Sequence, residues 1–336
     1  MNKISQSKNS LDILVFLRAV AVLMVCFCHF GAALEEGHYL SELFSCFGVY
    51  GKYGVYVFFV ISGFVIPLSL FRGKYILSYY SKFLFKRVVR LHPPYLAALL
   101  LTLVVSFLSY KVRHVEFPEN GFTIFKSLFY MHIPADNPVF WTLMVEAQYY
   151  IFIGFFFISI IKFPKLSLIL FIPLLLVISQ TYLANYISLL QYIVFFLVGT
   201  IGFLLYTQIG DFYLNWIVLL LLFTFIFFYN DIPSLLASSF TVLLILFSDF
   251  KISTGSKFLG LISYSVYLIH FPIGIKFINY FRPKIDPSYS WLLFLTTLVL
   301  SIILAWFFYL IFESYCEKMS KKIYYDEEKI LDKIKI

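Results

Sequence analysis

Four ionisable side chains lie inside long apolar stretches of the sequence: Arg18, His29, Glu146 and His270. Ionisable groups are costly inside a membrane and usually face the protein interior, so these positions are the first candidates for chemistry. A histidine, whose unperturbed pKa is about 6.5, can take up a proton at neutral pH, and a buried carboxylate is a natural partner for it. The alternative is a structural network, in which Arg18 reaches toward the membrane surface, His29 bonds to a neighbouring helix and Glu146 forms an ion pair.

The spacing of these residues places them within helices. Arg18 and His29 are eleven residues apart, which puts them on one face of a helix at depths about 16 Å apart. Glu146 follows Pro138, a residue suited to the start of a helix, by about two turns.

A basic cluster precedes the third long apolar run. The segment KFLFKRVVRLHPPY carries Lys86, Arg87 and Arg90 just before Pro93 and Pro94, and we expect the cluster at the cytoplasmic start of a helix. Arg87 and Arg90 share a helix face, and planar guanidinium groups match the oxygen atoms of phosphates. The same residues suit an anchor at the cytoplasmic membrane surface, and the residues alone leave both interpretations open.

Polar side chains also occur in a later apolar run. LGLISYSVYLIHFP carries Ser263, Tyr264, Tyr267 and His270 before Pro272. A polar stripe beside a proline kink can line a cavity, and hydrogen bonding between helices is the alternative. In GVYVFFVISGF, by contrast, the small residues favour close helix packing.

The composition identifies the surroundings of these segments. Of the 336 residues, 61% are hydrophobic and 13% are charged, whereas soluble proteins average roughly 45–50% and 25%. This excludes a water-soluble globular protein. Ten apolar segments occur, at residues 11–33, 53–71, 91–110, 138–161, 166–184, 188–206, 212–229, 234–250, 258–281 and 290–312. They are continuously apolar, which indicates an all-α polytopic membrane helix bundle with about ten transmembrane helices and not a β-barrel.

The basic residues favour one orientation in the membrane. Lysine and arginine gather in alternate loops, which predicts two cytoplasmic termini, with one transmembrane domain at residues 1–315 and a charged tail at residues 316–336. The net charge of +8 follows from this bias, so no nucleic-acid partner is expected. A cleaved secretory signal is the alternative for the first segment and would remove Arg18 and His29, but the segment is long enough to span.

Five segments, in order, resemble motifs of the acyltransferase-3 family of bacterial membrane O-acyltransferases: LRAVAVLMVCFCHF, YGVYVFFVISGF, KRVVRLHPPY, FWTLMVEAQYY and LGLISYSVYLIH. By position, Arg18 and His29 match the intramembrane arginine and histidine of the family, and Glu146 matches the carboxylate that follows a tryptophan. Arg87 and Arg90 match its basic cluster. Lys86 replaces the first arginine of that cluster, which keeps the charge and loses a bidentate fork.

The resemblance implies an enzyme of the bacterial inner membrane that moves an acyl group, most simply acetyl, from acyl-CoA to a hydroxyl of a surface or exported glycan. Under this hypothesis His29 is the general base and Glu146 orients it or stabilises its charged form. The residues that would hold the CoA phosphates are Arg18, Lys86, Arg87 and Arg90. The candidates for substrate contact are Trp141, Tyr267 and His270.

Other classes of protein also use ionisable residues inside membranes. A transporter or flippase of a lipid-linked glycan is the main alternative, although the sequence has no inverted repeat, and a non-catalytic scaffold fits so many ionisable groups poorly. We expect acyl-CoA as co-substrate, a glycan or lipid-linked saccharide as acceptor, membrane lipids as neighbours and, as an open option, a homo-oligomer. No metal and no permanently bound cofactor are expected, because the sequence has no ligand cluster or nucleotide-binding loop.

Overall fold

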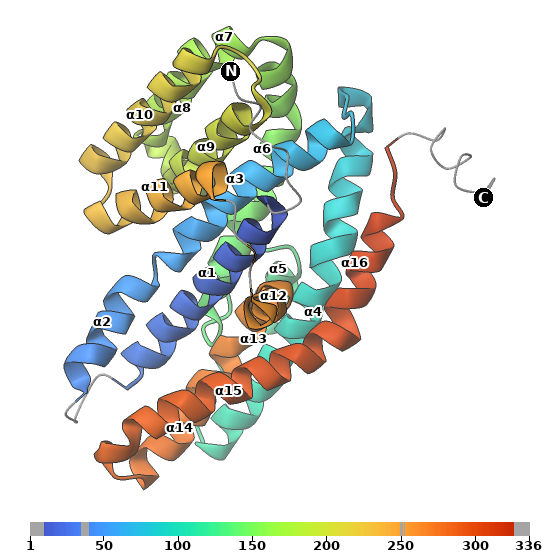
Figure 1. Ribbon diagram of the computed structural model, residues 1–336. Coiled ribbons are helices and arrows are strands. Elements are labelled where there is room, and N and C mark those ends of the chain that lie inside the picture. The colour runs from blue at the N-terminus through green and yellow to red at the C-terminus, as the bar shows by residue number, and fades with distance from the viewer. Residues whose placement is uncertain (1–9, 35–39, 249–250, 252, 326–336) are drawn as a thin grey trace.

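The computed structural model describes residues 10–34, 40–248, 251 and 253–325, and its regular structure is helical (Figure 1). No strand occurs in these residues, which confirms the all-α bundle predicted from the continuously apolar segments. The outermost parts of the two predicted cytoplasmic termini, residues 1–9 and 326–336, lie outside the described residues.

Sixteen α-helices follow one another along the part of the chain that the structure describes. The first eight are α1 (Ser10–Ala32), α2 (Ser41–Gly51), α3 (Gly54–Arg72), α4 (Tyr80–Val112), α5 (Gly121–Leu128), α6 (Trp141–Lys162), α7 (Pro164–Leu166) and α8 (Ile172–Ser179). The next eight are α9 (Ser188–Thr207), α10 (Phe212–Tyr229), α11 (Ile232–Phe247), α12 (Thr254–Leu261), α13 (Ser263–His270), α14 (Lys276–Phe281), α15 (Ser290–Phe308) and α16 (Ser314–Lys321).

Every one of the ten apolar segments is helical, but fewer than ten have the length of a membrane span. Among the described residues, seven helical stretches are long and apolar enough to cross a membrane, and the bent pair Thr254–Leu261 and Ser263–Lys284 makes an eighth. Pro164–Ser179 and Ile232–Phe247 are shorter. At about 1.5 Å per residue, helices of that length fall short of a hydrocarbon core about 30 Å thick. The multi-pass architecture is therefore confirmed, whereas the count of ten spans is not.

The third span begins earlier than the sequence indicated. It covers Leu77–Val112, so Arg87 and Arg90 lie within α4, and Pro93 and Pro94 lie in the interior of the same helix. Prolines are tolerated inside membrane helices because neighbouring groups satisfy the freed carbonyls. The basic cluster is thus presented from the side of a helix and not from its start.

The helices α1 and α3 run side by side through the middle of the bundle (Figure 1). The helix α3 packs against α9 and α11, whereas α1 packs against α12 and α13. On the other side of the bundle, α16 lies along α4. This arrangement brings α1, α4, α6 and α13 around one interior space, which contains the site described below.

The crossing of α3 and α9 is the tightest contact of the core. A Cβ atom on Gly63 would lie 2.1 Å from the carbonyl oxygen of Phe196, and one on Gly199 would lie 2.1 Å from the carbonyl oxygen of Val60. The Thr200 hydroxyl donates a hydrogen bond to the Gly63 carbonyl at 3.2 Å. Only glycine allows this approach, as the small residues of the second apolar segment predicted.

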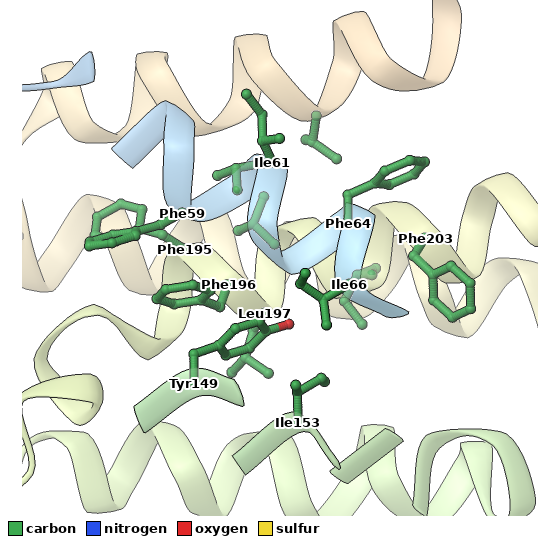
Figure 2. Close-up of a cluster of buried hydrophobic side chains, with 14 of the residues drawn as sticks. Phe59, Ile61, Phe64, Ile66, Tyr149, Ile153, Phe195, Phe196, Leu197 and Phe203 are labelled. Carbon is green, nitrogen blue, oxygen red and sulfur yellow. The ribbon is translucent and has the colours of Figure 1, made fainter. Parts of the chain in front are cut away.

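Aromatic rings from three helices pack around this crossing (Figure 2). Phe59 of α3 stacks on Phe196 of α9 with ring centroids 4.7 Å apart, and Phe196 stacks on Tyr149 of α6 at 4.1 Å. Ring stacking adds to the energy of apolar burial. This stacking fixes the position of α6 relative to α3. Glu146 lies one turn before Tyr149 on α6, so its position is fixed as well.

The ninth apolar segment is bent at a different point from the one predicted. The two helices Thr254–Leu261 and Ser263–Lys284 meet at 56° around Ile262, before the polar stripe and not after it. Pro272 instead lies in a π-helical turn, whose wider ring accommodates the missing N–H without a sharp kink. As a result α13 continues straight to His270, which is fully buried.

The long connection between α4 and α6 folds back onto the bundle. Asn120 caps α5 through a reciprocal pair of hydrogen bonds with Thr123. Further along, Tyr130 stacks on Tyr95 of α4 with ring centroids 4.3 Å apart, and the Tyr95 hydroxyl donates a hydrogen bond to the Ser127 carbonyl. The connection therefore contributes a side chain, Tyr130, to the interior.

The residues after α15 pack against α4 up to the end of the described chain. A π-helical turn, Tyr309–Glu313, joins α15 directly to α16, so the helix continues across the predicted domain boundary at residue 315. Tyr325 is 7% exposed and stacks on Tyr79 with ring centroids 6.0 Å apart. The first part of the predicted tail thus belongs to the packed body, and the boundary itself stays a prediction.

Candidate active site

Three arginines and two carboxylates line one interior cavity. Arg18 comes from α1, Arg87 and Arg90 come from α4, Glu146 comes from α6, and Glu313 comes from the turn before α16. The cavity has an empty volume of about 930 Å³, its open mouth included. Segments far apart in the sequence thus supply its charged groups, and apolar side chains of α3 form much of the remaining wall.

Arg87 is the most enclosed of the basic groups. Its side chain is 8% exposed, and its guanidinium carbon lies 5.6 Å from the ring centroids of both Phe83 and Tyr150. The Nε atom is buried and has no hydrogen-bond partner. A buried guanidinium that is not saturated by the protein is poised to bind a ligand with oxygen acceptors.

The arginines are not neutralised by direct contact with a carboxylate. Across the described ranges, neither an ion pair nor a hydrogen bond joins Arg18, Arg87 or Arg90 to an acidic side chain. Their N–H groups therefore stay available within the cavity. Guanidinium groups of this kind suit an anionic ligand, and phosphate above all, because its oxygens accept paired hydrogen bonds.

Neutral donors hold the two carboxylates instead. The Oε1 atom of Glu146 accepts hydrogen bonds from the Ser62 hydroxyl, at 3.3 Å, and from the Tyr150 hydroxyl. The Oε2 atom of Glu313 accepts hydrogen bonds from the backbone N–H and the hydroxyl of Ser265, at 3.1 Å and 2.6 Å. These bonds fix the carboxylates in the cavity wall and leave the arginines as its free charges.

Glu313 is the site residue that the sequence analysis missed. It lies directly after the last apolar segment, residues 290–312, and was not singled out there. The structure shows it 6% exposed and lining the cavity. The available signal was an acidic residue preceded by more than twenty residues without a charge, which is the pattern of an intramembrane carboxylate.

His29 and His270 form a second cluster, with ring centroids 5.4 Å apart. The Nδ1 atom of His270 lies 3.0 Å from the carbonyl oxygen of Val266 and 2.8 Å from that of Tyr267. A proton on Nδ1 satisfies these acceptors, which leaves Nε2 with a lone pair. This Nε2 atom is buried and has no hydrogen-bond partner.

Tyr267 connects the histidines to the cavity. It lines the cavity, and its ring centroid lies 6.0 Å from that of His270. Its hydroxyl lies 2.6 Å from the hydroxyl of Thr142 and donates a hydrogen bond to the Val139 carbonyl at 2.9 Å. The tyrosine therefore lies between the two clusters, with the charged cavity on one side and His270 on the other.

The structure brings some predicted site residues together and separates others. Arg18, Arg87 and Arg90, which were predicted as one group, share the cavity with Glu146, which was predicted beside His29. His29 instead lies beside His270, because α1 packs against α13. The expected contact between His29 and Glu146 is absent from the described contacts, since Glu146 bonds to α3 and to its own helix.

Lys86 and Trp141 lie outside the cavity lining. The Lys86 ammonium donates a hydrogen bond to the Ile323 carbonyl at 3.2 Å and lies 5.5 Å from the ring centroid of Tyr325. Trp141 packs against Tyr192 with ring centroids 4.8 Å apart. Binding of CoA by Lys86 and of the substrate by Trp141 thus stay predictions that no contact supports.

A second cavity adjoins the first one between α4 and α6. Its empty volume is about 700 Å³, its open mouth included. The residues that line both cavities are Arg87, Leu91, Leu143, Glu146, Tyr150 and Tyr264.

Comparison with known proteins supports the resemblance drawn from the five motifs. The acyltransferase-3 family model, described as an acyltransferase domain, matches residues 10–310, which include α1, α4, α6 and α13. No curated protein and no solved structure gives a significant match. The family match extends over most of the chain, and the helices are those of a multi-pass membrane protein. The chain therefore belongs to the acyltransferase-3 family and is a membrane acyltransferase.

Proposed function

We propose that this acyltransferase moves an acyl group from acyl-CoA to a hydroxyl of a surface or exported glycan, in the bacterial inner membrane and with both termini in the cytoplasm. The observation that carries the proposal is the meeting of Arg18, Arg87 and Arg90 in one interior cavity without direct contact to a carboxylate. CoA presents several phosphate groups, which guanidinium forks bind with high affinity. Acetyl-CoA is the simplest donor of this class.

The charged groups that line the cavity sum to a net positive charge. Glu146 and Glu313 share the cavity with three arginines, so its charged lining keeps one excess positive charge when all five groups are ionised. An anionic donor neutralises this excess. The apolar side chains of Leu91 and Leu143 then border the path of the uncharged pantetheine arm and the thioester.

The histidine pair supplies the base. His29 takes the proton of the acceptor hydroxyl, and the oxygen of that hydroxyl forms the ester bond to the acyl carbon. The carbon–sulfur bond of the thioester breaks, and the proton passes from His29 to the leaving CoA thiolate. We assign His270 as a positioning residue because its ring lies beside that of His29 and its Nε2 has no hydrogen-bond partner, so it could accept a hydrogen bond from a His29 N–H and leave the other His29 nitrogen to accept a proton.

The family match favours this chemistry over the transporter considered from the sequence. Glu146 has a different part in this proposal from the one predicted. It accepts hydrogen bonds from Ser62 and Tyr150 and lines the cavity with the arginines. Its contribution is therefore to the binding of the donor and not to the orientation of His29.

The test is the transfer of radiolabel from acetyl-CoA into glycan in membranes that contain the full chain. We expect His29→Ala to abolish transfer at an unchanged protein level. The matched control is His132→Ala, because His132 pairs with Glu119 at 2.8 Å in the connection between α4 and α6 and lines neither cavity. Full activity of His29→Ala would overturn the base assignment, and a wild-type chain that binds no acetyl-CoA would overturn the choice of donor.

A further inference from the structure

Pro272 deprives one backbone carbonyl of α13 of its helical donor. In an α-helix the N–H of each residue donates to the carbonyl four residues earlier, so the carbonyl of Leu268 would accept from residue 272. Proline has no N–H, and its ring clashes with the carbonyl at that position. In a membrane protein, a carbonyl freed in this way needs a donor from another part of the chain.

The side chain of Asn137 is this donor. Its Nδ2 atom donates to the Leu268 carbonyl at 3.1 Å and to Thr102 Oγ1 at 3.0 Å. The Thr102 hydroxyl gives its own proton to the Ala98 carbonyl at 2.8 Å, so both partners of Nδ2 are acceptors and the orientation of the amide is determined. Asn137, Thr102 and Leu268 are each 0% exposed, so solvent does not reach these bonds.

The segment just before α6 contacts the chain on both sides of His270. Before His270, the Tyr267 hydroxyl donates a hydrogen bond to the Val139 carbonyl at 2.9 Å. After His270, the Lys276 ammonium donates to the Asp136 carboxylate at 2.8 Å. His270 therefore lies in a short stretch of chain that this segment holds at both ends.

The side chain of His270 depends on the same end of α13. Its Nδ1 atom lies 3.0 Å from the Val266 carbonyl and 2.8 Å from the Tyr267 carbonyl. The next carbonyl along the chain is that of Leu268, to which Asn137 donates. A change in the orientation of this end of the helix would also move the carbonyls that hold the imidazole, whose ring centroid lies 5.4 Å from that of His29.

We infer that Asn137 is a positioning residue: it replaces the N–H that Pro272 lacks and so holds the end of α13 with His270 beside His29. The inference rests on the proposed function, in which His270 positions the base, and adds a residue that acts through the backbone of α13. Asn137 lines neither cavity, so its effect should fall on kcat and not on the binding of the donor.

The test compares Asn137→Ala with Asn215→Ala by transfer of radiolabel from acetyl-CoA into glycan, in membranes that contain the full chain. Asn215 of α10 is a matched control because it is 1% exposed, its Nδ2 donates to the Ile209 carbonyl at 2.9 Å, and it lines neither cavity. We expect Asn137→Ala to lower kcat about 10- to 100-fold at an unchanged KM for acetyl-CoA, because a misplacement of about 1 Å costs about 100-fold. Asn215→Ala should keep the wild-type kcat, although it too loses a buried hydrogen bond.

A second substitution tests whether the effect passes through the Leu268 carbonyl. Pro272→Ala supplies an N–H to this carbonyl, so Asn137→Ala should lower both kcat and the melting temperature less in a Pro272→Ala chain than in the wild type. The comparison of melting temperatures needs no transfer reaction and therefore tests the bond independently of the proposed function.

Three results would overturn the inference and leave the donor and the base in place. They are a wild-type kcat in Asn137→Ala, a rise in KM for acetyl-CoA as its only kinetic change, and an equal effect of Asn137→Ala with and without Pro272→Ala. Absence of transfer by the wild-type chain would instead overturn the proposed function itself.

Discussion

Replacement of Arg87 by methionine distinguishes the effect of this residue on the stability of the fold from its contribution to donor binding. Arg87 is 8% exposed and has no carboxylate in direct contact, and its Nε has no partner. Exchanging buried charged groups for apolar side chains of similar volume stabilises proteins by about 1–4 kcal/mol in documented cases. We therefore expect Arg87→Met to raise the melting temperature of the ligand-free chain, as measured by thermal unfolding in detergent.

The same variant should bind the donor poorly. A hydrogen bond to a charged group contributes about 1.5–3 kcal/mol, which corresponds to a loss of about 10- to 150-fold in affinity for acetyl-CoA. The control is Arg72→Met, since Arg72 is an exposed arginine at the end of α3 and does not line the cavity. A lower melting temperature together with an unchanged affinity would show that Arg87 is a structural residue and would refute the reasoning.

Three further predictions concern the core, the histidine pair and a carboxylate outside the spans. Gly199→Ala should lower the free energy of unfolding by about 3 kcal/mol, because the added Cβ atom would lie 2.1 Å from the backbone of α3. The control Gly121→Ala should not lower it, because no atom lies within 4 Å of a Cβ atom there. Equal thermal stability of the two variants would contradict this prediction. His270→Asn should reduce kcat about tenfold or more and shift its pH profile, with KM for acetyl-CoA unchanged, if His270 acts through His29; a change in KM alone would indicate a binding residue. Burial alone would raise the pKa of Asp231, but the hydrogen bonds that it accepts hold this pKa below its usual range. Its contribution to stability is then complete above the unfolded-state pKa of about 3.9 and is lost as the pH falls through the lower folded-state value. The melting temperature of the wild type should therefore decrease more steeply with falling pH in this range than that of Asp231→Asn. An equal dependence of the two melting temperatures on pH would argue against the lowered pKa.

The sequence predicts the helices well and their contacts less well. Continuously apolar runs specify membrane helices whatever surrounds them, and each of the ten runs is helical. Whether a run such as Ile232–Phe247 spans the membrane depends on a difference of a few residues in length, which the apolar pattern does not resolve. The start of α4 was misplaced because the apolar run begins only after the basic residues up to Arg90, whereas the helix already begins at Tyr80 and includes them.

For the candidate site, too, the sequence indicates which residues to consider but not which of them are in contact. Arg18 and Glu146 were selected because ionisable groups are rare in apolar runs, and Arg87 because it lies in a basic cluster, and all three line the cavity. The partner of His29 could not be derived, since spacing fixes faces along one helix but does not show that α1 packs against α13 and leaves Glu146 elsewhere. The contact of Lys86 could not be derived either, because its acceptor, the Ile323 carbonyl, is 237 residues away in the sequence.

That long-range bond has a consequence for biosynthesis. The helix α4 is synthesised and can enter the bilayer long before α16 and the residues that bond to Lys86 exist, yet α16 covers one of its sides in the finished protein. During translation this side of α4 therefore stays without its final neighbour until α16 has been synthesised. The final packing of the charged cavity, which includes Glu313 from the turn before α16, is completed only when this turn has been synthesised.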